Sequence, residues 1–152
     1  MRKTLKINVP DGYEIDKEKS TFEYIVFKRI GDAEIKWNVC TFSVEIKADG
    51  EYFMVHAGFP SYCCSWNDAM RFHKSDVWSL PTVKQLKVLS KHLDAVNAVI
   101  RENNGYEITG YFWSREEKDE FYAWNVDVGC GDSSCGKKTR DGYVRSVSAL
   151  VY

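Results

Sequence analysis

The alternation of apolar and polar residues is clearest between residues 111 and 147. Three aromatic or β-branched runs lie there, separated by polar connections at residues 115–120 and 129–141. In the middle run, one face of an extended chain carries Tyr122, Trp124, Val126 and Val128. The other face carries Phe121, Ala123, Asn125 and Asp127. This period of two predicts a half-buried antiparallel strand, and the polar connections are expected at the surface.

The N-terminal third shows strand-like runs as well. One strand is predicted by the alternation of Leu5, Ile7 and Val9, and a turn signal follows at residues 10–13. Aromatic and β-branched residues predict further strands at 21–30, 36–47 and 51–58. A hairpin turn is expected at residues 48–50, where the sequence is Ala-Asp-Gly, and an aromatic loop at residues 59–64.

Capping signals predict two or three short helices in the middle of the chain. Ser65 is a candidate N-cap for a helix through Phe72. Thr82 and Gln85 form a capping-box pattern that opens a second helix. A third is expected from about residue 94 to 103, ended by Gly105. Helices grouped between early and late strands predict an α+β fold with antiparallel sheets.

The length of the chain, 152 residues with 44% hydrophobic and 14% aromatic content, suits one domain with an N-terminal extension. We place the extension at residues 1–48 and the domain at residues 49–152. The extension has two interpretations: a strand pair that docks on the domain, or an arm that joins neighbouring subunits into a homo-oligomer.

Charge and hydropathy exclude two classes of partner. The formal net charge is −1, and no basic cluster of the size of a protein face occurs, so nucleic acid is a disfavoured partner. No apolar run is long enough for a signal peptide or a membrane span. We therefore expect synthesis in the cytoplasm without membrane insertion.

Cysteines and histidines give no metal or cofactor site. The five cysteines are an odd set in a chain without an export signal, so reduced thiols are the default. A disulfide between Cys130 and Cys135 in an oxidising medium remains the alternative. The histidines, at positions 56, 73 and 92, have no second ligand at a metal-like spacing. No cofactor and no metal are expected.

A series of ordered motifs carries a family resemblance. They are Trp66 with Ala69, residues 78–82 with Gln85-Leu86, residues 111–114, residues 123–126, and Tyr143-Val144-Arg145 with Val147. In this order and rough spacing, residues 49–151 resemble the C-terminal domain of bacterial collagen-like adhesins. That domain is a C-type-lectin-like domain of unknown function, found in bacterial surface and phage-encoded proteins. The resemblance implies a C-type-lectin-like fold and a virion-associated or released protein.

Elementary physics gives these motif residues structural roles. Trp113 and Trp124 are expected to close the core beneath the displayed loops. Arg145 lies among apolar residues, so we expect it to stack on an aromatic ring or to bind backbone carbonyls. The calcium-binding tripeptides of sugar-binding lectins of this fold, Glu-Pro-Asn and Gln-Pro-Asp, do not occur, and residues 124–127 only approach Trp-Asn-Asp. Calcium-independent behaviour is therefore expected.

No catalytic constellation is apparent, so we do not expect an enzyme. The carboxylates at 116, 117, 119 and 120 are interleaved with Arg115 and Lys118, as in a solvated loop. The remaining interpretation is that the C-terminal loops are displayed to bind a protein or glycan ligand. The predicted ligand-binding residues are Tyr111, Arg115, Glu117, Tyr122, Asp132, Ser133, Ser134, Arg140, Asp141 and Tyr143. The alternative is a structural or assembly subunit of a phage or surface fibre.

Overall fold

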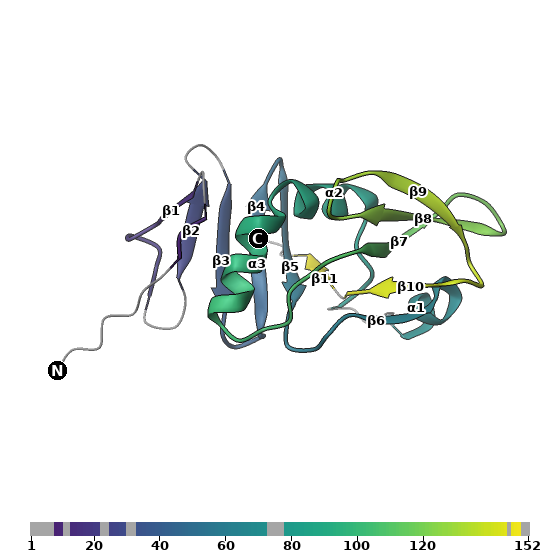
Figure 1. The fold of residues 1–152 in the computed structure, drawn as a ribbon, viewed down its shortest axis with the longest axis horizontal. Helices are drawn as coiled ribbons and strands as arrows, with labels where there is room; N and C mark the ends of the chain where they lie inside the picture. Colours follow the sequence, from purple (N-terminus) through teal and green to yellow (C-terminus); the bar gives the residue numbers. More distant parts are fainter. Residues whose placement is uncertain are drawn as a thin grey trace.

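Two β-sheets lie side by side along the long axis of the molecule, with helices packed against both (Figure 1). The computed structural model describes residues 8–10, 13–21, 25–29, 33–72, 78–145 and 147–149. The first sheet has the strand order β1-β2-β3-β4-β5-β11, and every pair in it is antiparallel. Its strands are β1 (Tyr13–Ile15), β2 (Val26–Arg29), β3 (Glu34–Asn38), β4 (Ser43–Ala48), β5 (Glu51–His56) and β11 (Val147–Ala149).

The second sheet has the order β6-β10-β7-β8-β9 and is mixed, because β7 and β10 pair in parallel. Its strands are β6 (Tyr62–Ser65), β7 (Tyr111–Glu117), β8 (Tyr122–Asp127), β9 (Ser133–Lys137) and β10 (Asp141–Val144). The helices are α1 (Trp66–Phe72), α2 (Val83–Lys91) and α3 (Leu93–Glu102). Helix α3 contacts β3 and β4, whereas α2 contacts β5 of one sheet and β7 and β8 of the other, so α2 bridges the sheets (Figure 1). The predicted α+β class is confirmed.

The hairpin turns follow from local chemistry. Asp49 and Gly50 have φ angles of 52° and 78°, as a type I′ turn between β4 and β5 requires, which confirms the predicted turn. A single strand over residues 36–47 was the wrong prediction. The Asn38 side-chain oxygen accepts a hydrogen bond from the Thr41 amide at 3.1 Å, and Phe42 has a φ of 51°. This turn folds the run into the β3–β4 hairpin.

Two strands lie where the sequence predicted loops. Strand β6 occupies part of the predicted aromatic loop, and β9 occupies part of the predicted connection 129–141. Both are edge strands of the second sheet, and neither has a buried residue, so neither shows the apolar alternation by which strands are recognised. The connection at residues 115–120 is exposed as expected, although β7 extends into it.

The predicted helices are confirmed, and their caps explain where they begin. The Asp68 amide donates to Ser65 Oγ at 3.2 Å at the start of α1. At α2, the Gln85 amide donates to Thr82 Oγ1 at 3.0 Å, and the Thr82 amide donates to Gln85 Oε1 at 2.9 Å, which completes the capping box.

Helix α3 ends in a Schellman motif, and the left-handed residue is Asn104, with φ of 57°, rather than Gly105. The Gly105 amide donates to the Ile100 carbonyl at 2.9 Å, and the Asn104 amide donates to the Arg101 carbonyl at 3.2 Å. Gly105 is required for a different reason: a Cβ atom there would lie 2.9 Å from Ile100 Cγ2.

Two hydrophobic clusters form the interior. The larger lies between the first sheet and the helices and includes Trp37, Phe53 and Val126. The smaller contains Trp66, Leu80, Trp113, Ala123 and Val144. Strand β8 contributes Ala123 to one cluster and Val126 to the other, both fully buried. The expectation of one buried and one solvated face on β8 is therefore wrong, because each face meets a core.

The two predicted tryptophans differ in burial. Trp113 is 2% exposed and belongs to the smaller cluster, as expected. Trp124 is half-buried, and its ring lies 5.8 Å from Lys118 Nζ. Only Trp113 therefore closes a core. The Trp124 ring instead makes a cation–π contact with Lys118, which lies in the turn between β7 and β8.

The N-terminal strands belong to the first sheet. Leu5 and Ile7 lie outside the described residues, and Val9 is exposed. The Tyr13 hydroxyl forms a 2.5 Å hydrogen bond with His92 Nδ1, which ties β1 to the junction of α2 and α3. His92 Nε2 lies 3.4 Å from Asp49 Oδ2. The domain division predicted between residues 48 and 49 falls within the paired β4–β5 hairpin.

Arg145 lies between β10 and β11, where the chain passes from the second sheet to the first. One guanidinium nitrogen donates to the carbonyls of His56, Phe59 and Tyr106 at 3.0–3.1 Å. The rest of the guanidinium donates to the Glu107 carbonyl and to Ser61 Oγ. The residue is 5% exposed, and burial lowers the pKa of the guanidinium to about 10, so it stays charged at neutral pH. The predicted structural arginine is confirmed.

No helix in the described part of the chain is long and apolar enough to span a membrane.

Replacing Arg145 with Gln should lower the free energy of unfolding by about 3–5 kcal/mol, because several buried carbonyls lose their donor. Urea denaturation followed by tryptophan fluorescence measures the change. Arg71→Gln is the matched control: that side chain is 70% exposed, and its ion pair with Asp68 is worth less than about 1 kcal/mol. Equal losses in the two variants would contradict the role of Arg145.

Candidate functional site

A groove of about 450 Å³ on the second sheet brings together half of the predicted ligand-binding residues. Those present are Tyr111, Ser134, Arg140, Asp141 and Tyr143. The groove is also lined by Cys63, Trp113, Asn125, Cys135, Gly136 and Gly142. These eleven residues come from β6, β7, β8, β9, β10 and the β9–β10 connection, and we call the hollow the Trp113 groove.

The floor of the groove is built around the Trp113 indole. Its Nε1 donates to the Cys64 carbonyl at 3.1 Å, which fixes the ring against β6. A Cβ atom at Gly142 would lie 2.6 Å from Trp113 Nε1, and one at Gly136 would lie 2.7 Å from Trp113 Cη2. Both glycines are therefore needed because the indole lies against the backbone of β9 and β10.

Two tyrosines supply exposed aromatic surface. Tyr111 is 55% exposed and Tyr143 is 41% exposed. The Tyr143 ring lies 5.9 Å from the Phe112 ring and packs over Gly110, where a Cβ atom would come within 3.0 Å of it. Gly110 has a φ of 98°, so glycine is favoured there on conformational grounds as well. Because Tyr143 pairs with Phe112 across β10 and β7, its ring lies on the Phe112 face of the sheet, opposite the face that carries Trp113 and Tyr111.

The polar groups of the groove offer both donors and acceptors. Ser134 Oγ donates to Asn125 Oδ1 across the β8–β9 pair. Asp141 and Arg140 are both exposed, and the Arg140 side chain has no hydrogen bond or ion pair with any residue in the described ranges. A guanidinium, a carboxylate, an amide and a hydroxyl thus line the same groove as the exposed Tyr111 ring.

The other predicted ligand-binding residues lie outside the groove. Arg115, Asp132 and Ser133 do not line it, and Glu117 pairs with Lys138 Nζ at 3.3 Å. Tyr122 lines a separate hollow of about 550 Å³, together with Phe121 and Lys137.

Sequence reasoning missed Cys63, Trp113, Asn125, Cys135 and the two glycines as groove residues. Cys63 lies on a strand that the sequence did not reveal. Asn125 interrupts the apolar run of β8, and that interruption was the signal available in the sequence.

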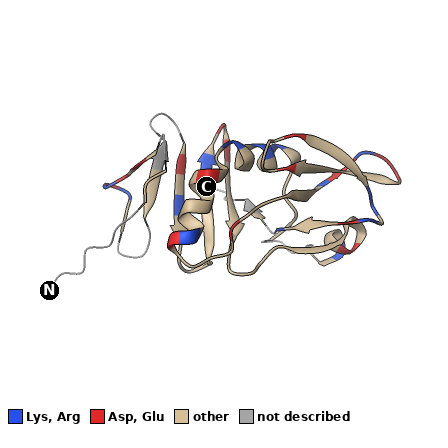
Figure 2. Ribbon diagram, viewed as in Figure 1, with Lys and Arg blue, Asp and Glu red and all other residues tan. Residues whose placement is uncertain are grey.

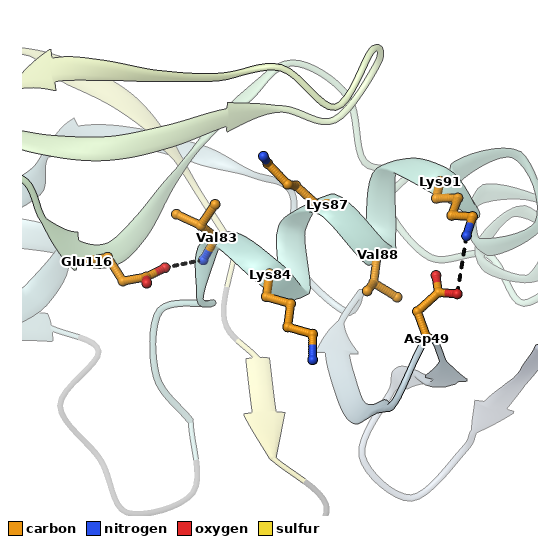
Figure 3. Close-up of a pocket in the computed structure, with 7 residues that line it drawn as sticks. All are labelled: Asp49, Val83, Lys84, Lys87, Val88, Lys91 and Glu116. Atoms are coloured by element: carbon orange, nitrogen blue, oxygen red, sulfur yellow. Dashed lines mark hydrogen bonds and ion pairs between the residues drawn. The ribbon is translucent and has the colours of Figure 1, made fainter.

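A third hollow, of about 430 Å³, follows one side of α2 (Figure 3). Lys84 and Lys91 are each paired, with Glu51 at 3.0 Å and with Asp49 at 3.2 Å. Figure 3 shows Lys84 and Lys87 pointing in opposite directions from the helix. The ammonium groups are neutralised or diverge, so this hollow does not concentrate charge on one ligand, and we do not take it as the candidate site.

Thiol and metal chemistry were also considered. The five cysteines are free thiols, and burial raises the pKa of the Cys64 thiol. Within the described ranges, no group of three or more His, Cys, Asp or Glu side chains is arranged to hold a metal ion.

Comparison with protein-family models and with curated proteins found no match to this chain.

Replacing Gly142 with Ala should cost about 1–3 kcal/mol of folding free energy, the usual range for overpacking, because the new methyl group meets the Trp113 indole. Urea denaturation measures the loss. The same substitution in a Trp113→Phe background is the control, since the smaller ring leaves room for the methyl group and the cost should shrink. An unchanged cost in that background would show that the indole contact is not its cause.

Proposed function

We propose that this protein is a non-enzymatic binding module that contacts a protein or glycan partner through the Trp113 groove. The observation that carries the proposal is the exposed Tyr111 ring together with the unpaired Arg140 guanidinium beside a fixed indole floor. Tyrosines combine a large contact area with few rotatable bonds, so they bind partners at a low entropic cost.

The carboxylates of residues 115–120 support a binding role over a hydrolytic one. Glu116 accepts a hydrogen bond from the Val83 amide at the start of α2 (Figure 3). Asp119 accepts from the amides of Phe121 and Tyr122 at 2.8 and 2.9 Å. Glu116 and Asp119 therefore stabilise a helix end and a turn, and their carboxylates are not placed as an acid–base pair.

The distribution of charge favours a protein or glycan over a nucleic acid. Figure 2 shows basic and acidic residues interspersed along the strands and helices of the described ribbon. A phosphate backbone is bound by a continuous basic stripe, because its affinity depends on the release of counterions.

We propose, in addition, a C-type-lectin-like fold and a phage or adhesin setting, with cytoplasmic synthesis followed by virion association or release. The structural roles of the motif residues support this assignment. Trp66 Nε1 donates to the Ser114 carbonyl at 2.7 Å, Trp113 forms the groove floor, and Arg145 binds the junction between the sheets.

Tyr111→Ala should weaken partner binding at least tenfold, which corresponds to about 1.4 kcal/mol. Protein and glycan arrays would identify the partner, and biolayer interferometry would measure the affinities. Phe72→Ala is the control, because Phe72 is 66% exposed on α1, outside the groove. Wild-type affinity in the Tyr111 variant, with the fold verified by circular dichroism, would overturn the proposal.

A structural or assembly subunit is the second candidate, and the position of β1 favours it. This three-residue strand lies at the edge of the first sheet, where another chain can pair with it. Its hydrogen bond to His92 holds it to its own subunit. Tyr13→Phe removes that bond and should raise the oligomeric fraction, measured by light scattering during gel filtration. Monomers of both proteins at every concentration would exclude strand exchange.

A further inference from the structure

We propose that the ligand of the Trp113 groove is a saccharide that bears a carboxylate group, and that Arg140 binds this carboxylate. This inference rests on the proposed function and narrows it to one class of ligand. Its basis is the combination, in one groove, of an unpaired guanidinium, the exposed Tyr111 ring and neutral polar groups that include both hydrogen-bond donors and acceptors.

Arg140 and Arg115 have no side-chain partner within the described residues, and of these two arginines only Arg140 lines the groove. Arg71 and Arg101 are paired with carboxylates, at 2.7 and 2.6 Å, and Arg145 is bound by carbonyls. Arg140 has no side-chain partner within the described residues, although it stands next to Asp141. Its amide donates to the Lys137 carbonyl at 2.9 Å, so the turn that carries it is fixed. The planar guanidinium of Arg140 is carried on a fixed backbone and has no partner, so it can donate two parallel hydrogen bonds to the two oxygens of a carboxylate.

The charged residues that line the groove are Arg140 and Asp141, so their formal charges balance. The preference for an acidic ligand therefore rests on the Arg140 guanidinium, which has no partner of its own in the described part of the chain.

The other groups of the groove fit a sugar ring. A hydroxyl group donates and accepts at once, and the Asn125 amide, the Ser134 hydroxyl and the Asp141 carboxylate supply both kinds of partner. The face of the Tyr111 ring carries negative charge density, which attracts the weakly positive C–H groups of a sugar. The volume of about 450 Å³ lies within the range of small-ligand sites.

A protein partner fits the floor less well. Protein hot spots fill desolvated pockets with a large aromatic or aliphatic side chain. Here Trp113 is only 2% exposed, and its neighbours on the floor are the backbones of Gly136 and Gly142, so no apolar pocket opens beneath the groove. The polar walls and closed floor favour a ligand that binds by its edges and ring faces.

The test uses the full chain with matched oligosaccharides that carry either glucuronic acid or glucose at one position, and with acidic peptides as a third arm. Isothermal titration calorimetry should show the acidic saccharide binding at least tenfold tighter than the neutral one, with affinity falling as salt rises. Arg140→Gln should remove this preference, and Arg140→Lys should retain part of it. Arg115→Gln is the control, because that arginine is exposed but lies outside the groove.

The outcomes separate this inference from the proposed function. Equal affinity for neutral and acidic saccharides, or groove-dependent binding of peptides alone, would overturn the carboxylate assignment and leave the binding module standing. An acidic preference that survives Arg140→Gln would also overturn it, by placing the carboxylate elsewhere. If no saccharide, peptide or arrayed protein binds in a way that Tyr111→Ala weakens, both proposals fail.

Discussion

The buried charge of Arg145 is the constraint on which the arrangement of the two sheets depends. A guanidinium removed from water needs hydrogen-bond acceptors from the protein, and here the loop after β5 and the segment after α3 provide them. Satisfying the charge therefore brings those segments together at the point where β10 gives way to β11. Tyr143 stands two residues before Arg145, so the same contacts set where one wall of the Trp113 groove lies.

The second sheet is both a scaffold and a surface because it has a core on each side. Val126 of β8 packs with the larger cluster, and Ala123 and Trp113 pack with the smaller one. A sheet held from both faces is rigid, and rigid strands are a better base for a binding site than mobile loops. Apart from Val144, no residue of β9 or β10 belongs to either cluster, which leaves their polar side chains available for a ligand.

Local chemistry determines which features the sequence can reveal. The caps at Ser65 and Thr82 are encoded within four residues, and both helices begin where those residues indicate. The turn at residues 39–42 depends on one hydrogen bond from the Thr41 amide to the Asn38 side chain. The alternation typical of a strand continues through residues 36–47, so the sequence pattern does not reveal this turn. The exposure of Tyr111 and Tyr143 was predictable, but the placing of their rings on opposite faces depends on the parallel pairing of β7 with β10, which no local spacing encodes.

The fit of Trp113 between two glycine backbones has a consequence for binding thermodynamics. The indole is hydrogen-bonded and closely contacted at both ends, so the floor is preorganised before any ligand arrives. Association then restricts mainly the side chains of Tyr111 and Arg140, at about 0.5–1.5 kcal/mol for each flexible group. The entropy lost on complex formation is thereby confined to the rim of the groove, and its base contributes almost none.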